Sequence, residues 1–517
     1  MDGLIARHDR PQPSLLAKRR EAARAARRGR EHAPLVFAAL LALALGAALL
    51  GFRDLPMMDL PQHAVQVATW VNWERLASAE REALELNLRT PYLLAYPLAR
   101  ALSPLLGVLT SLKLVVWLAA LGNGLALWGL ARRLGHSPWL GLLGLPLTFG
   151  FSFYYGFVSF LLATPLVVFA LLLALEHAAN PGIWPGLGLG ALLCVTLLAH
   201  GFALAISLLS VTAPLAFGPL RSLPHRLAPL GAPIALGLLW LGPAAQQAAL
   251  YDYSIRPGRS VQWLSMILGP GSFRDIGALA LGVAIASLVL SSLGRFSQAP
   301  GRWGLLAVAL GGYALVPELF WNTAFLHERL VAFLVPALML ACEPRRSNGL
   351  SRLTAPLTLG ICAIWLAVFS MRLADFNREM ADYHALVDPL PAGLRVRPLI
   401  FQRDSHAFPG APAYLHVSAY YHASKGGLPA YSFAVQPSAV IRYREGHGSQ
   451  LAPGLEWMAD RFDAESEAER YDYFLVLGEP SFDPFANSPV PIVPDACRGS
   501  FCGYWRAAAL GREARLP

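Results

Sequence analysis

Apolar runs of about twenty residues recur along this chain as far as Phe369, and they restrict the folds open to it more than any other feature. Crossing a hydrocarbon core about 30 Å thick takes roughly 17–25 apolar residues per helix. The sequence offers eleven candidate runs, at residues 34–52, 112–131, 138–154, 156–175, 183–198, 201–220, 227–245, 276–293, 303–319, 330–342 and 353–369. We therefore predict a mainly α polytopic membrane bundle of about eleven transmembrane helices.

Composition and charge agree with a membrane protein and argue against nucleic-acid binding. Hydrophobic residues make up 55% of the chain and charged residues 15%, whereas soluble proteins average about 45–50% and about 25%. The net charge of +9 reflects basic residues clustered in the leader, residues 1–33, and in short loops between apolar runs. This pattern is typical of cytoplasmic segments, so we predict a cytoplasmic N-terminus. Phe52 and Arg53 follow the first run where a cleavage site would need small residues, so this run is predicted to be retained.

The stretch RTPYLLAYPLARALSPLLG, residues 89–107, decides how the loops are divided between the two membrane faces. It is apolar enough to cross but contains three prolines and Arg100. If it does not cross, the arginine-bearing loops lie on the same face as the leader, as the positive-inside rule requires. We therefore predict an interfacial or re-entrant segment. The transmembrane domain, residues 34–371, then has an external loop, residues 53–107, that carries interfacial helices.

The last part of the chain, residues 372–517, has the pattern of a soluble α/β domain on the external side. It combines β-like runs, LRVRPLIF, YFLVLGE and GYWRAAAL, with the helix-like DAESEAERYD. No phosphate-binding loop, zinc-type cysteine pairing or nucleophile elbow is recognisable in it. Cys497 and Cys502 lie five positions apart, and we predict a disulfide in an oxidising compartment, with two free thiols as the alternative.

The segment MDLPQHAVQVATW, which begins at Met58, places an aspartate and a histidine shortly after the first apolar run. One interpretation of Asp59 is a helix N-cap, because Pro61 suits the first turn of a helix. An ionisable side chain kept at a membrane boundary is also a candidate for function. His63 lies four residues after Asp59 on the same helix face, and it is either a partner in chemistry or a buried structural residue.

Two further clusters are predicted on the same external side. Arg256 and Arg259 in YDYSIRPGRSVQW stand among aromatic residues, where guanidinium groups suit phosphate oxygens or lipid headgroups. His327, Glu328 and Arg329 open the tenth apolar run. Because a cation at a helix start is unfavourable toward the helix dipole, Arg329 is predicted to have an anionic partner, either a carboxylate of the protein or a ligand.

Three more residues complete the candidates because they fall on the same side. His200 lies between two apolar runs that as one helix would be about 60 Å long, twice a bilayer, so the chain is predicted to turn there. Tyr154 and Tyr155 lie in the aromatic bend between the third and fourth runs. We predict that all these side chains meet in one pocket at the external membrane boundary.

This layout resembles the GT-C superfamily of integral-membrane glycosyltransferases. The local match is RDLPMMDLPQHAVQ, followed by TPYLLAYPLA and LARRLGH, and the resemblance covers the transmembrane domain. Members of that superfamily transfer a sugar from a polyprenyl-phosphate carrier to an acceptor on the non-cytoplasmic face. The resemblance implies that Asp59 is the general base, with His63 beside it, and that Arg256, Arg259 and Arg329 hold the leaving phosphate.

The resemblance also sets the expected partners, which are a lipid-linked sugar donor, a lipid, glycan or protein acceptor, and the bilayer of a plasma or bacterial inner membrane. Many relatives carry paired acidic residues where this chain has Asp59-Leu60, so the sequence gives no support for a divalent metal and no cofactor is predicted. A non-catalytic transporter, flippase or envelope assembly protein and a glycan polymerase or ligase are alternative functions. The substrate-binding candidates besides the arginines are Tyr154, Tyr155, His200, His327 and Glu328.

Overall fold

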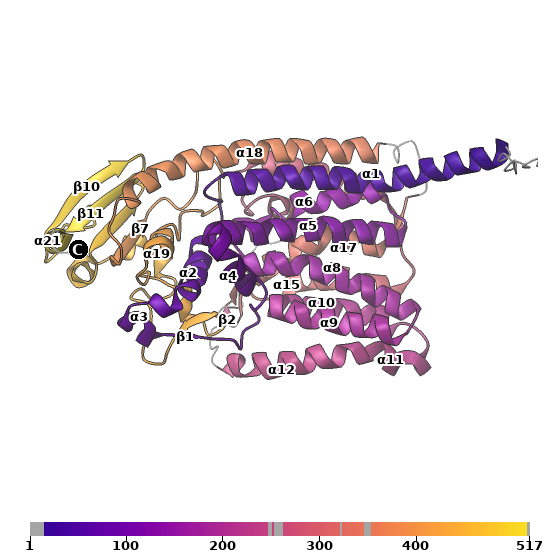
Figure 1. Ribbon diagram of the computed structural model, residues 1–517, viewed down its shortest axis with the longest axis horizontal. Coiled ribbons are helices and arrows are strands. Elements are labelled where there is room, and N and C mark those ends of the chain that lie inside the picture. Colours follow the sequence, from indigo (N-terminus) through magenta and orange to yellow (C-terminus); the bar gives the residue numbers. More distant parts are fainter. Residues whose placement is uncertain (1–14, 247–250, 253–261, 321–322, 346–352, 514–517) are drawn as a thin grey trace, which may run out of the picture.

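The computed structural model describes residues 15–246, 251–252, 262–320, 323–345 and 353–513, and it is mostly helical. Helices lie side by side in one elongated bundle, and a small sheet lies beyond one end of it (Figure 1). The long helix α18 (Thr354–Val387) runs along the bundle and continues toward that sheet. We call the end of the bundle nearer to the sheet the sheet end, and the opposite end the distal end.

Within the described residues, four helices carry an apolar stretch long enough to cross a membrane. Large apolar side chains are exposed on the bundle, for example Trp184, which is 80% exposed, and a surface of this kind requires lipid around it. The protein is therefore a membrane protein, while eleven spanning helices remain a prediction. The four helices are α1 (Leu15–Gly51, apolar over Ala33–Gly51), α5 (Val108–Leu134), α8 (Val158–Ala179) and α18.

The other predicted apolar runs form shorter helices. Three of these reach 16 or 17 residues with strongly apolar sequences: α9 (Ile183–Ala199), α10 (Gly201–Ala216) and α14 (Ile276–Ser292). The chain turns between α9 and α10 at His200, as the sequence predicts. The remaining runs contain α12 (Gly231–Gln246), α15 (Gly304–Leu315) and α17 (Leu334–Ala341).

The third predicted run, residues 138–154, is broken rather than continuous. Glycines explain how closely it packs on α5: a Cβ on Gly141 would lie 2.5 Å from the Trp128 Cβ, and one on Gly144 would overlap the Asn123 carbonyl. The run is divided into the 3-10 helix η2 (Pro138–Leu143), α6 (Gly144–Leu147) and α7 (Phe151–Tyr154).

The arginine-bearing loops meet at the distal end of the bundle. Arg133 lies 3.5 Å from Glu176 and Arg302 lies 2.6 Å from Glu343. Strands β3 (Leu293–Phe296) and β6 (Cys342–Pro344) pair at the same end. This gathering of positive charge at one end is the arrangement that the positive-inside rule predicts for a single membrane face.

The segment 89–107 lies at the sheet end, where it forms the helix α4 (Ala95–Leu106). Its 12 residues amount to about 18 Å at 1.5 Å per residue, too short to cross a bilayer. The structure thus agrees with a segment that does not span. In the helix α2 (Leu60–Val71), Leu60 to Ala68 are buried, and whether helices of the external loop lie in the membrane interface stays a prediction. The helix α2 packs between the bundle and the C-terminal domain.

The predicted domain boundary at residue 372 falls inside a helix, because α18 continues unbroken to Val387. The extension beyond the apolar part is held by polar contacts with the chain that follows α1. Asn377 exchanges hydrogen bonds with the backbone of Asp54, and His384 Nε2 lies 2.8 Å from the Asp54 carboxylate. The ring of Tyr383 also packs on Phe501, with centroids 5.6 Å apart, so the end of α18 belongs to the C-terminal domain, which begins inside the helix.

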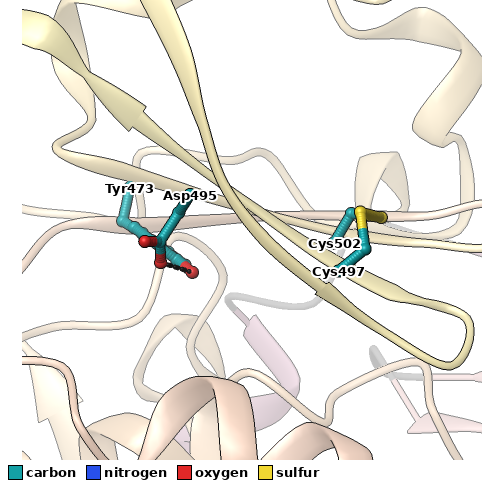
Figure 2. Close-up of a disulfide and its surroundings, with 4 residues drawn as sticks. All are labelled: Tyr473, Asp495, Cys497 and Cys502. Atoms are coloured by element: carbon teal, nitrogen blue, oxygen red, sulfur yellow. Dashed lines mark hydrogen bonds between the residues drawn. A yellow bond between two sulfur atoms is a disulfide. The ribbon is translucent and has the colours of Figure 1, made fainter.

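The C-terminal domain contains a four-stranded sheet in the order β10-β11-β9-β7, with β7 and β9 parallel and the other pairs antiparallel. The runs LRVRPLIF and YFLVLGE form β7 and β9 as predicted, whereas GYWRAAAL is a strand only as far as Arg506 and continues as the helix α21 (Ala507–Glu513). Figure 2 shows the disulfide between Cys497 and Cys502, which joins β10 to β11, and the hydrogen bond from Tyr473 to Asp495. The strands are β7 (Val396–Ile400), β9 (Tyr473–Leu477), β10 (Ile492–Arg498) and β11 (Phe501–Arg506).

Two glutamines on α2 dock the C-terminal domain through its backbone. Gln62 bonds the Tyr431 carbonyl (2.9 Å) and the Phe433 N–H (3.2 Å), and Gln66 bonds both backbone groups of Ile441 (2.9 and 2.8 Å). The chain after α2 adds a strand pair, β1 (Leu84–Leu86) with β8 (Ile441–Tyr443). Buried amides that satisfy both a donor and an acceptor of a backbone fix its position. The C-terminal domain is therefore anchored on the segment that carries Asp59.

Short elements complete the described chain. The helices are α3 (Ser78–Ala83), α11 (Leu223–Leu227), α13 (Trp263–Ile267), α16 (Leu326–Arg329), α19 (Ala419–Lys425), α20 (Ala464–Glu467) and α21 (Ala507–Glu513). The strands β2 (Tyr251–Asp252), β4 (Leu319–Phe320) and β5 (Thr323–Ala324) form a small sheet.

Candidate functional site

A cavity of about 480 Å³ lies at the sheet end, between the bundle and the C-terminal domain. The bundle side supplies charged and polar groups together with aromatic rings: Asp59, His63, Tyr92, Tyr96, Phe157, Phe160, His200, Phe325 and Arg329. The C-terminal domain supplies the opposite wall, which we call the roof and which includes His416, Tyr431, Phe433, Glu456 and Trp457. A concave site with aromatic walls and a few convergent polar groups is typical of ligand binding.

Asp59 is the acidic residue of the described first loop, residues 53–107, that faces this cavity. It stands at the N-cap position of α2, but its side chain makes no capping hydrogen bond. The residue is 7% exposed, and Oδ1 has no hydrogen-bond partner among the described residues. The ring of His416 approaches it, with Nε2 3.5 Å from Oδ1. Capping is thus not what this carboxylate does, and its Oδ1 is buried without a hydrogen-bond partner among the described residues.

The aromatic bend after α7 holds Asp59 in place through its backbone. The Met58 N–H donates to the Tyr154 carbonyl at 2.9 Å. Gly156 has a φ of +83°, and a Cβ there would lie 2.6 Å from the Asp59 nitrogen. Glycine is thus required twice, for the left-handed backbone and for the close approach. Tyr155 contributes differently, because its ring packs on Phe325 with centroids 4.7 Å apart.

His63 braces this arrangement and is not free to react. Its Nε2 lies 2.9 Å from the Gly156 carbonyl and its Nδ1 lies 2.6 Å from the Tyr96 hydroxyl. Since a carbonyl only accepts, we assign the ring proton to Nε2, and Nδ1 then accepts from Tyr96. Burial lowers the pKa of His63 to about 4, so the ring is neutral at pH 7. Of the two alternatives that the sequence left open, the structural one fits these contacts.

Arg329 brings a positive charge to the cavity. Its Nε donates to the Phe325 carbonyl (3.3 Å), its Nη2 to the Ala324 carbonyl (3.1 Å), and its Nη1 lies 3.1 Å from His200 Nε2. The guanidinium also lies 3.7 Å from the centroid of the Phe157 ring. Burial lowers the pKa of Arg329 to about 10, so it stays charged at pH 7. The groups that hold it are neutral, so its charge is not cancelled by a direct contact with them.

The loop that cradles Arg329 is strained at one residue. Phe325 has φ 58° and ψ 40°. Within the described residues, every other residue with a positive φ is a glycine. A bulky residue in this region costs on the order of 1 kcal/mol, and such strain collects at ligand sites. The conformation turns two successive carbonyls, those of Ala324 and Phe325, toward one guanidinium.

The electrostatics of Asp59 follow from its burial. Removal from water raises the pKa of the Asp59 carboxyl well above its usual value, the Arg329 charge opposes this rise, and Glu456 on the roof adds to it. Burial also lowers the pKa of His416 to about 3 and that of His200 well below its usual value. As far as the described residues go, the cavity therefore contains neutral imidazoles, one cation and two carboxyl groups.

Not every predicted site residue reaches this cavity. His327 and Glu328 pair with each other, Nδ1 to Oε2 at 2.9 Å, and Glu328 faces a separate small cavity of about 40 Å³ inside the bundle. Tyr154 packs its ring on Phe408. Arg256 and Arg259 lie outside the described residues. The structure thus brings together Asp59, His63, His200 and Arg329 of the predicted set.

The roof residues were not predicted from the sequence. His416, Glu456 and Trp457 lie in the tail, far along the chain from Asp59, and no motif connects these positions. The one available signal was the pair of glutamines on the apolar helix α2, four residues apart, which indicated a polar docking partner.

Comparisons with protein-family models, curated proteins and solved structures found no match. Among the residues that the structure describes, no group of three or more His, Cys, Asp or Glu side chains is arranged to hold a metal ion. The site is therefore interpreted from its own geometry.

Proposed function

We propose that this protein is a membrane glycosyltransferase of the GT-C type, which moves a sugar from a polyprenyl-phosphate-linked donor to an acceptor on the non-cytoplasmic face. One observation carries the proposal. The Asp59 carboxylate, buried and with an unpartnered oxygen, faces a cavity that also holds the Arg329 guanidinium at one end of an apolar bundle. Such a bundle end gives a lipid-linked substrate access to a water-poor site.

The proposed reaction uses these two groups in distinct roles. The acceptor oxygen attacks the anomeric carbon, the bond from that carbon to the phosphate oxygen breaks, and the hydroxyl proton passes to Asp59. A raised pKa makes Asp59 a stronger proton acceptor than an exposed aspartate. Negative charge collects on the leaving phosphate, and Arg329 is the cation of the described cavity that stabilises it.

The walls of the cavity support a sugar-transfer reaction as well. Aromatic rings line much of it and offer faces to the C–H groups of a sugar. His63 and His200 are neutral, so neither competes with Arg329 for the phosphate as a second cation. Exclusion of water by these walls would protect a donor that hydrolyses readily.

A transfer assay with a matched control tests the proposal. Membranes containing the protein are supplied with radiolabelled polyprenyl-phosphate sugars and a membrane extract as acceptor source, and Asp59→Asn is compared with Asp54→Asn. Both aspartates are buried on the same segment, but Asp54 bonds to His384 outside the cavity. We expect Asp59→Asn to lose about 10²–10⁴-fold in rate, the usual size of a general-base contribution. Equal losses in the two variants, or transfer that survives Asp59→Asn, would remove Asp59 as the base.

A further inference from the structure

The roof of the cavity contains chemistry that the proposed transfer does not use. Residues of the loop 453–457 line the cavity, beginning with Pro453 and Gly454, whose φ is +92°. It is followed by the 3-10 helix η10 (Leu455–Trp457), which presents Glu456 and Trp457 as half-buried side chains. Asp59 and Arg329 are buried on the opposite side. The roof and the bundle side therefore offer different environments to a ligand.

Glu456 is a half-buried carboxylate of the cavity wall, and its side chain is held by backbone hydrogen bonds. Its Oε2 accepts from the Gly454 N–H at 2.6 Å, which closes the turn and fixes the side chain. Burial raises the pKa of Glu456, so its charged form lacks the full solvation that water would give it. A carboxylate held in this way gains from hydroxyl donors, and each further hydrogen bond to the charged form is stronger than one between neutral groups.

Two aromatic rings stand on the same wall. Trp457 lines the cavity, and the Arg403 guanidinium lies 5.6 Å from its ring centroid. Tyr431 stacks on His416 with centroids 5.6 Å apart and an interplanar angle of 21°, so its orientation is fixed. Rigid aromatic faces with a carboxylate beside them suit a ring that has C–H groups on its faces and hydroxyl groups around its rim. A sugar has this distribution of groups.

Charge decides which class of sugar ligand suits the roof. Glu456 adds a second carboxylate to a cavity whose described cation, Arg329, lies on the bundle side. Arg403 contacts Trp457 but does not line the cavity, so a phosphate or a sugar acid inside the cavity near Glu456 would meet like charge, which is unfavourable in a poorly solvated site. A neutral carbohydrate meets no such penalty. The donor phosphate therefore belongs near Arg329, and a neutral ring belongs near the roof.

We propose that Glu456, Trp457 and Tyr431 form an acceptor subsite for a neutral carbohydrate, so that the hydroxyl presented to Asp59 belongs to a glycan. The assignment of this ligand as acceptor rests on the proposed glycosyl transfer. The binding of a neutral sugar at the roof does not, because it depends on the roof residues alone.

Direct binding tests the subsite without any transfer. The full chain is reconstituted in nanodiscs, because detergents with maltose headgroups would occupy a sugar site, and is titrated calorimetrically with soluble trisaccharides of glucose, mannose, galactose and arabinose. We expect saturable binding of at least one of them. Trp457→Ala and Glu456→Gln should each weaken it at least about tenfold, as removal of a central anchor does. Asp54→Asn, which lies outside the cavity, should bind within about threefold of the unaltered protein, because the roof is intact.

Controls keep the result unambiguous. Trp457→Phe preserves an aromatic face and should retain most of the affinity, so it replaces Trp457→Ala in the test if that variant fails to fold. Trp184→Ala is the control outside the cavity, because it removes an exposed tryptophan of α9. No saturable binding by any trisaccharide, or binding unaffected by both roof variants, would overturn the subsite. If transfer survives Asp59→Asn while binding behaves as expected, the catalytic proposal fails and the carbohydrate site stands.

Discussion

Asp59 Oδ1 and His416 Nε2 lie 3.5 Å apart, and this approach joins the loop after the first membrane helix to the C-terminal domain. His416 is held by its stacking on Tyr431 and by an edge contact with Phe433. Because burial lowers the pKa of His416 to about 3, the ring is neutral at pH 7 and can donate one hydrogen bond. The orientation of the candidate base is therefore shared between two parts of the chain.

Removal of the His416 ring should change the pH dependence of transfer. A ring N–H near Oδ1 favours the charged carboxylate, so His416→Ala should raise the pKa of Asp59 further and move the acid limb of the rate profile to higher pH. His416→Asn keeps a neutral donor and should restore part of the shift. An acid limb that stays in place in His416→Ala would show that the ring does not act on Asp59.

Asp59→Asn should stabilise the protein at neutral pH. The folded state raises the pKa of this carboxyl, so it binds the proton more tightly than the unfolded chain does. Stability is then greatest below the unfolded pKa of about 3.8 and falls as the pH rises toward the folded pKa. We expect the Tm of Asp59→Asn in nanodiscs to exceed that of the unaltered protein by on the order of a few degrees at pH 7 and to match it near pH 4. A lower Tm at pH 7 would contradict the assigned burial penalty.

Gly156→Ala should damage the site more than an equivalent change elsewhere. Both Gly156 and Gly135 have a positive φ, of +83° and +79°, but a Cβ at Gly135 would make only an ordinary contact, 3.7 Å from Pro344. Gly135→Ala should therefore cost about 1 kcal/mol from the backbone alone, whereas Gly156→Ala should cost roughly 1–3 kcal/mol more through its clash with Asp59. Thermal unfolding with a parallel transfer assay measures both effects. Equal losses would show that the close approach is unimportant.

Arg329→Lys should weaken use of the donor although it preserves the charge. One ammonium group cannot reach the carbonyls of Ala324 and Phe325 and the His200 ring in the three directions that a guanidinium does. We expect about a 10–100-fold loss in kcat/KM for the lipid-linked donor, with little change in KM for the acceptor. Arg397→Lys is the control, since Arg397 is also buried but pairs with Glu467 in the C-terminal domain. Losses of the same size in both variants would point to folding.

Membrane orientation can be measured by cysteine labelling. Ser78 is exposed at the sheet end and Gln298 is exposed in a loop at the distal end. In a chain without the three free cysteines, Ser78→Cys should react with an impermeant maleimide from the non-cytoplasmic side, and Gln298→Cys should react only after the membrane is permeabilised. Reaction of both from the same side would contradict a bundle that crosses the membrane between them.

Much of the helical framework could be predicted from the sequence, because apolar periodicity and length are local properties. The turn at His200 follows from length alone, and the strand β9 from a continuous apolar run. The broken helices between Pro138 and Tyr154 could not be predicted, since their shape depends on how Gly141 packs on α5. Local patterns contain no information about such contacts.

Some residues of the candidate site could likewise be predicted from the sequence, and others could not. Asp59 and Arg329 were recognisable because ionisable groups at the ends of apolar runs are unusual. The ring of His63 has two partners, Tyr96 and the Gly156 carbonyl, that only the folded chain brings to it. The roof was missed for a similar reason: Glu456 becomes part of the site when the tail folds back over α2.

The helix α2 has Asp59 at its start and the two glutamines, Gln62 and Gln66, one and two turns further on. One helix thus positions the Asp59 carboxylate and binds the C-terminal domain. A tilt of that domain would move α2 and, with it, Asp59. A large ligand that displaces the roof would therefore also change the position of the proposed base. A chain truncated before the C-terminal domain would lose the contacts that position Asp59 as well as the roof of the cavity.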